Sequence, residues 1–159
     1  MKTLKTLLLA TVLTTGAAIC GCGARQDAAA YNNRLMTLMN ANEQDMTAMN
    51  TAMTAHDYRK AEQVRKDWVQ DLSDALRQAM ATESFRGDDS LKAAVVGGLT
   101  AYRKIVSQDY RELIAARTTN DSAAEAREPG LLSRINDGFE RAGSAINEAA
   151  DRFQESYGR

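Results

Sequence analysis

Residues 129–157 read PGLLSRINDGFERAGSAINEAADRFQESY, and they carry the clearest helical pattern in the chain. Apolar side chains recur there every three or four residues, at Leu131, Ile135, Phe139, Ala142, Ile146, Ala149, Phe153 and Tyr157. Because an α-helix turns once in about 3.6 residues, this spacing puts them all on one face. Pro129 suits the first turn, where its missing N–H costs nothing. The stretch predicts a long amphipathic helix that must pack against other helices.

A first helix is predicted over about residues 27–55. Its inward positions are Tyr31, Leu35, Leu38, Asn42, Met46, Met49 and Met53. Neighbouring members lie three or four residues apart, so they form a stripe along one helical face. Asn42 is the polar exception in that stripe.

Two more helices are predicted between these segments. Asp57 is the expected N-cap of the second helix, and the helical pattern of apolar residues ends near Ser84. Its inward positions are Ala61, Val64, Trp68, Leu72, Ala75 or Leu76, and Ala79. Residues 85–89 are predicted as a turn, and Asp88 or Asp89 caps the third helix. The inward positions of that helix are Leu91, Val95, Leu99, Tyr102, Val106, Tyr110 and Leu113.

Two features interrupt this pattern. Gly97 and Gly98 fall inside the third helix, and we interpret them as a kink or a close approach of two helices. A hinge or a place where a ligand approaches is the alternative. Residues 117–128, RTTNDSAAEARE, are predicted as a loop with a short helical turn in its alanine-rich middle. The fold class is therefore all-α, an antiparallel up-down-up-down four-helix bundle over residues 27–159.

The N-terminal segment, residues 1–22, reads MKTLKTLLLATVLTTGAAICGC. Lys2 and Lys5 give it a basic start, and residues 7–19 form an uncharged apolar run that ends in small residues. This order is typical of an export signal. The run is too short to cross a hydrocarbon core of about 30 Å as a mature helix.

The end of this segment resembles the lipobox of bacterial lipoproteins, with Ile19, Cys20 and Gly21 in the places before the acylated Cys22. Cys20 departs from the usual alanine or serine but is small enough to fit. If Cys20 were the anchor, the β-branched Ile19 would stand directly before the cleavage site, where the family has Gly, Ala or Ser. Cys22 is therefore the better candidate for the anchor. A plain secretory signal that leaves a free thiol on Cys22 is the alternative.

The resemblance implies a division of the chain. Residues 1–21 are the lipoprotein signal peptide, Cys22 carries a diacylglycerol and an N-acyl chain, and residues 22–26 form a short tether. In this family an Asp after the acylated Cys favours retention in the inner membrane. Gly23 stands there instead, so the expected location is the cell envelope, with the outer membrane favoured and periplasmic or surface exposure left open.

The mature part is also similar to uncharacterised helical-bundle envelope lipoproteins of Gram-negative bacteria, through the start of its first helix at Tyr31-Asn32-Asn33. That similarity implies no activity.

The chain has 20 Lys and Arg against 21 Asp and Glu, and therefore no basic field for nucleic acid. His56 is the single histidine of the chain, so there are no Glu-x-x-His pairs for a di-metal site. It falls at the predicted end of the first helix, where four regular helices offer no shaped cleft for a Ser-His-Asp triad. We therefore expect that the protein is not an enzyme.

One cluster has ligand chemistry. Met46, Met49, Met53 and His56 lie on one helical face, and thioether and imidazole groups suit Cu(I) or Ag(I). The segment looks like the methionine-rich motifs of exported copper- and silver-binding proteins. The same spacing is what a core seam requires, and methionine is a pliable core filler, so we favour the structural interpretation.

The sequence therefore predicts an envelope lipoprotein, bound to the membrane by its acyl chains, that acts as a structural or protein-interaction module with an envelope protein partner. No cofactor beyond the acyl chains is expected. Soft-metal binding is the alternative, and a carrier of a small ligand in the bundle core is third, because no polar constellation in the sequence supports it.

Overall fold

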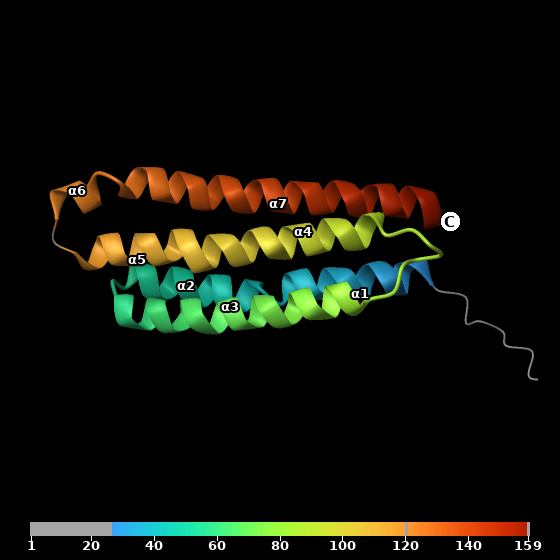
Figure 1. Cartoon of the computed structure of the whole chain (residues 1–159), viewed down its shortest axis with the longest axis horizontal. Coiled ribbons are helices and arrows are strands. Elements are labelled where there is room, and N and C mark those ends of the chain that lie inside the picture. The colour runs from blue at the N-terminus through green and yellow to red at the C-terminus, as the bar shows by residue number, and fades with distance from the viewer. Residues whose placement is uncertain (1–26, 120, 159) are drawn as a thin grey trace, which may run out of the picture.

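The computed structural model describes residues 27–119 and 121–158, and these are almost entirely helical (Figure 1). The elements in chain order are α1 (Ala28–Asn40), α2 (Glu43–Thr54), α3 (Tyr58–Ala81), α4 (Ser90–Lys104), the π-helical turn η1 (Ile105–Asp109), α5 (Tyr110–Thr118), α6 (Ser122–Glu125) and α7 (Glu128–Tyr157). Across the described residues no strand forms, which confirms the all-α prediction. None of the described helices is both long enough and apolar enough to span a membrane.

Four helical rods make up the architecture. The first is α1 followed by α2, the second is α3, the third is α4 with η1 and α5, and the fourth is α7 (Figure 1). The start of α1, the α3–α4 turn and the end of α7 lie at one end of the molecule. The α2–α3 junction and the short α6 lie at the other end, and both described ends of the chain are therefore far from α6.

The first rod is not the single helix expected over residues 27–55, because it breaks at Ala41 and Asn42. The side-chain amide of Asn42 donates to the carbonyl oxygens of Leu38 and Met39, at 3.2 and 3.0 Å. Such local bonds compete with the helical ladder. The amide oxygen of Asn42 accepts a hydrogen bond from the indole N–H of Trp68 at 2.9 Å. Asn42 is only 3% exposed, so its place in the inward stripe is correct although the helix does not continue through it.

Trp68 is fully buried at the centre of the core. Its ring stacks on Phe139, with centroids 5.8 Å apart and planes within 5°, and it lies 5.9 Å from the ring of Tyr110. These contacts join the second, third and fourth rods. Aromatic rings bury much apolar area and add favourable stacking contacts, so this cluster contributes strongly to stability.

A second aromatic cluster closes the end of the core at the α3–α4 turn. Phe85, in the predicted turn, is fully buried and lies 5.2 Å from the ring of Tyr31 and 5.0 Å from that of Phe153. The backbones of Phe85 and Asp88 exchange hydrogen bonds of 2.9 and 2.8 Å around Arg86 and Gly87, which both have positive φ. This tight reversal confirms the turn predicted over residues 85–89.

Helix α4 continues unbroken through Gly97 and Gly98, so the predicted interruption is wrong at that place. The close-approach interpretation is confirmed for Gly98, because a Cβ atom at that position would overlap Cδ1 of Ile146 on α7. A Cβ atom at Gly97 would meet nothing within 4 Å beyond its own helical turn. Gly98 is therefore the residue that lets α4 and α7 pack closely.

The irregularity in the third rod is η1 instead. A π turn holds one residue more than an α turn. The wide turn takes up this extra residue, so that Tyr110, Leu113 and Ile114 still lie on the buried face. If the same residues formed a regular α-helix, the apolar positions after Val106 would be turned away from the core.

Local signals at the other helix ends are confirmed. The Asp57 side chain accepts a hydrogen bond from the Lys60 N–H at 2.9 Å and so caps α3. Residues 117–128 contain the short α6, as the alanine-rich middle indicates, although α5 extends to Thr118. Pro129 lies in the first turn of α7.

We expect Asn42→Ala to lower the free energy of unfolding by about 1–3 kcal/mol, because the buried indole N–H of Trp68 loses its acceptor. Asn40→Ala is the matched control, since Asn40 is exposed at the end of α1, and its effect is expected to be below about 0.5 kcal/mol. Urea unfolding measures both values. Equal values for the two variants would contradict the role given to Asn42.

Replacement of Gly97 and of Gly98 by alanine is expected to change the stability of the protein in opposite directions. Gly97→Ala is expected to stabilise the protein by about 0.5–1 kcal/mol, because alanine restricts the unfolded chain and meets no neighbour in the helix. Gly98→Ala is expected to destabilise it by about 1–3 kcal/mol through overlap with Ile146. The double variant Gly98→Ala with Ile146→Val should recover part of that loss. Stabilisation by both single variants would show that α4 and α7 are not held at this distance.

Candidate functional site

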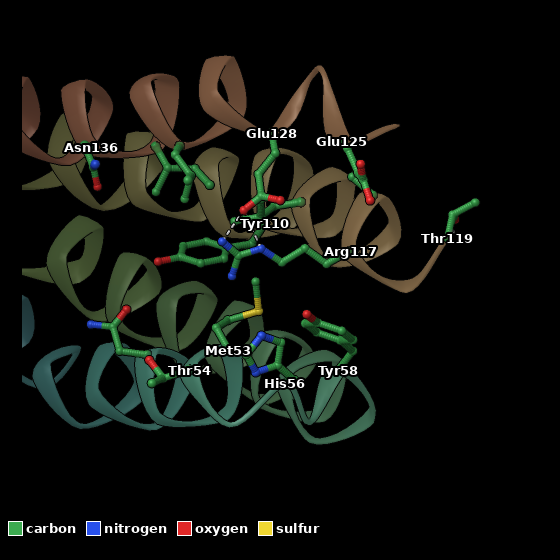
Figure 2. Close-up of a pocket in the computed structure, with 15 residues that line it drawn as sticks. Met53, Thr54, His56, Tyr58, Tyr110, Arg117, Thr119, Glu125, Glu128 and Asn136 are labelled. Atoms are coloured by element: carbon green, nitrogen blue, oxygen red, sulfur yellow. Dashed lines mark hydrogen bonds and ion pairs between the residues drawn. The ribbon is translucent and has the colours of Figure 1, made fainter. Parts of the chain in front are cut away.

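A cavity of about 620 Å³ opens at the α6 end of the bundle (Figure 2). Its walls come from the end of α2, the start of α3, α5, α6 and the first turns of α7. An apolar side is formed by Met53, Leu113, Leu132 and Ile135, and the remaining lining is largely polar or aromatic. The volume lies within the range of about 300–1,000 Å³ that is typical of small-molecule sites.

His56 reaches the mouth of this cavity because of the way α2 ends. Its backbone has a φ of 57°, in the left-handed region that glycine usually fills. The His56 N–H donates to the carbonyl of Met53 and the Asp57 N–H donates to that of Ala52, at 3.2 and 3.0 Å, which is a Schellman-type helix end. The ring of His56 then meets the edge of the Tyr58 ring, with centroids 6.0 Å apart.

An ion pair fixes the opposite wall. Nε and Nη2 of Arg117, near the end of α5, both donate to Oε1 of Glu128 at the start of α7, and the Nε bond measures 2.8 Å (Figure 2). The two side chains are 24% and 28% exposed. This pair closes the loop that carries α6 and holds the guanidinium group inside the cavity.

Tyr110 supplies the deepest polar group. The residue is 7% exposed, and its ring packs against Trp68 and Phe139. Burial raises the pKa of the Tyr110 hydroxyl above its ordinary value, so the group stays protonated at neutral pH and can donate a hydrogen bond. In Figure 2 this hydroxyl points into the space between Asn136 on α7 and Thr54 on α2.

The structure separates the four candidate metal ligands. Met49 is fully buried in the core, and Met53 is 7% exposed where it lines the cavity. Met46 is half-buried and lines a different cavity, and His56 is exposed. Only Met53 and His56 therefore share a site. In the described part of the chain, no group of three or more His, Cys, Asp or Glu side chains is placed to hold a metal ion.

The lipidation site and its surroundings lie outside the described residues. This holds for Cys22, for the signal peptide over residues 1–21 and for the tether over residues 22–26.

The cavity is not evident from the sequence, because the pattern gives its parts other roles. Tyr110 is predicted to lie in the core, and Arg117 and Glu128 are only the limits of a predicted loop. The available signal is the opposite charge of these two residues at the two ends of a polar interval, which is a pattern that can close a loop.

We expect Glu128→Gln to lower the free energy of unfolding by about 1–2 kcal/mol, because the partly buried Arg117 loses its carboxylate. Glu148→Gln is the matched control. The pair that Glu148 forms with Arg152 spans 3.7 Å between side chains 69% and 68% exposed, so its loss should cost less than about 0.5 kcal/mol. Thermal and urea unfolding measure the difference. If Glu128→Gln were as stable as the control, the pair would not hold the wall of the cavity.

The chemistry that this arrangement offers is recognition by hydrogen bonds over an apolar floor. Among the described residues, neither the ring of His56 nor the hydroxyl of Tyr110 is hydrogen-bonded to another side chain, so no nucleophile and base are paired here. No protein-family model, no curated protein and no solved structure matches this chain.

Proposed function

We propose that this protein is a bacterial envelope lipoprotein that serves as a structural or protein-interaction module. Residues 1–21 are its signal peptide, Cys22 carries the acyl chains, and residues 22–26 tether an antiparallel up-down-up-down four-helix bundle to the membrane. The observation that carries the proposal is the order of basic start, apolar run and Ile19-Cys20-Gly21-Cys22. Three acyl chains on one residue anchor a protein almost permanently, since each buried methylene contributes about 0.8 kcal/mol.

The position of the first helix agrees with a short tether. Asp27 caps α1, with its carboxylate accepting a hydrogen bond from the Ala29 N–H at 2.8 Å, so helix begins directly after the proposed tether. A fully extended chain covers about 3.5 Å per residue, which gives the tether a reach below about 20 Å. The bundle would then stand close to the lipid surface, with the start of α1 and the end of α7 nearest to it.

In this proposal the cavity faces away from the bilayer. Helix α7 has 30 residues and, at about 1.5 Å per residue, is roughly 45 Å long. The α6 end lies across this length from the start of α1 (Figure 1). A soluble envelope component could therefore reach the cavity and the adjoining helix faces. We assign no catalytic role to the protein, and Gly23 favours the outer membrane as its place of attachment.

The anchor is tested by expressing the full chain in a Gram-negative host and separating membranes from soluble periplasm. The wild-type protein should partition with the membranes, and mass spectrometry of its N-terminal peptide should show acylated Cys22. Cys22→Ser should abolish both properties, because serine has no sulfur to acylate. Cys20→Ser is the matched control and should leave both unchanged, since serine also fits the middle place of the site.

An unmodified thiol on Cys22, or membrane association that survives Cys22→Ser, would overturn the anchor. The interaction role has a separate test, which is crosslinking in intact envelopes followed by purification of the anchored protein and of Cys22→Ser. A partner recovered only with the anchored form supports the module, and recovery of none speaks against it.

A further inference from the structure

The cavity of Figure 2 contains a hydrogen-bonding group that no other described residue uses. Tyr110 as a residue is 7% exposed, and its hydroxyl has no hydrogen-bond partner among the described residues. The hydroxyl oxygen is not one of the described side-chain atoms that are shut off from solvent, so its open side lies on the cavity. A molecule inside the cavity can therefore take the place of water as its partner.

Other unused groups surround the same space. The side chains of Asn50, Thr54 and Asn136 lie at the rim, and none of them bonds to another described residue. Nη1 of Arg117 is likewise without a described partner, since its Nε and Nη2 serve Glu128. The amides provide donors and acceptors, the hydroxyls provide both, and the guanidinium provides donors. These groups come from α2, α5 and α7, which are distant in sequence.

The charges argue for an uncharged ligand. Glu128 neutralises the charge of Arg117 and accepts hydrogen bonds from its Nε and Nη2 atoms. An anion that bound to these two donors would have to displace the Glu128 carboxylate. A cation would meet the guanidinium group at the middle of the cavity. The further carboxylate of the lining, Glu125, is exposed on α6, and in Figure 2 it lies beyond Glu128, away from the Tyr110 hydroxyl.

The volume of the cavity and its apolar floor narrow the class of ligand further. Met53, Leu113 and Ile135 form an apolar surface, and the rings of His56 and Tyr58 stand at the mouth. A molecule that fits must have carbon-bound hydrogens to cover this surface and several hydroxyl groups to meet the polar side. A cavity of about 620 Å³ has room for one or two sugar rings.

We propose that this cavity binds a small uncharged polyhydroxylated ligand, namely a monosaccharide or disaccharide. The Tyr110 hydroxyl bonds a ligand hydroxyl at the base, Nη1 of Arg117 donates from the wall, and Asn50 and Asn136 bond at the rim. The apolar floor and the two rings cover the carbon faces. This site does not depend on the lipid anchor, because every residue that lines it lies between Asn50 and Asn136 in the described part of the chain.

The test uses the full chain, purified in a zwitterionic detergent that carries no sugar group. The probes are glucose, N-acetylglucosamine, cellobiose and trehalose at millimolar concentrations, with acetate and choline as charged probes. Ligand-observed NMR and calorimetry measure binding. At least one of the four sugars should bind saturably, and acetate and choline should not.

Tyr110→Phe removes only the unpartnered hydroxyl and keeps the ring that packs on Trp68. It should therefore unfold at the same temperature as the wild type or higher, and it should bind the sugar about tenfold more weakly. Tyr102→Phe is the matched control. Tyr102 also packs on Phe139, with centroids 4.6 Å apart, but it does not line this cavity, so its loss of a hydroxyl should leave the affinity unchanged.

Three results would overturn the proposal. The first is a folded wild-type protein that binds none of the four sugars saturably. The second is sugar binding by Tyr110→Phe that equals the wild type. The third is saturable binding of acetate or choline that is tighter than that of every sugar. The charged probes act on the wild type alone, so the proposal stays testable even if Tyr110→Phe fails to fold.

Discussion

The hydrogen bond from the Trp68 indole to the Asn42 amide is the constraint on which the rest of the structure depends. It joins the first and second rods inside the core, where neither group can form a hydrogen bond with water instead. The same Asn42 side chain ends α1 by bonding to the carbonyls of Leu38 and Met39. With its nitrogen fixed, the Trp68 ring is held in the position where it stacks on Phe139 and meets Tyr110. One amide therefore acts on a helix break, on the orientation of the largest core side chain and on the contacts among all four rods.

The sequence predicts those parts of the fold whose causes are local. The Asp57 cap, the residue 85–89 turn and the place of Pro129 each depend on a few adjacent residues, and all three are confirmed. The break at Asn42 could not be found in this way, because the three-and-four spacing continues through it and the hydrogen bond that holds the Asn42 side chain inside the core comes from Trp68, 26 residues away. The π turn is hidden for a related reason, since an apolar pattern of threes and fours accommodates one extra residue without a visible gap.

The cavity shows the same division between local and distant causes. The sequence correctly predicts His56 at a helix end, but nothing near it in sequence indicates Tyr110 or Arg117, which arrive from the third rod. The methionine stripe is also divided, because Met49 is fully buried, Met53 borders this cavity and Met46 borders another. A face defined by helical spacing alone cannot say which of its members the neighbouring rods cover. Those contacts decide whether a thioether is core filler or is open to a ligand.

The π turn at η1 lets the third rod hold one residue more than a regular helix between the same contacts. Each residue advances a regular helix by about 100°, but the wide turn takes up the extra residue locally, so the helices before and after it keep their facing. If the same residues formed a regular α-helix, Gly98 before the turn would keep its place against Ile146, whereas Tyr110 and Arg117 after it would be rotated away from the core and from Glu128 by about that angle. The walls of the cavity therefore depend on a widened turn that lies outside the cavity itself.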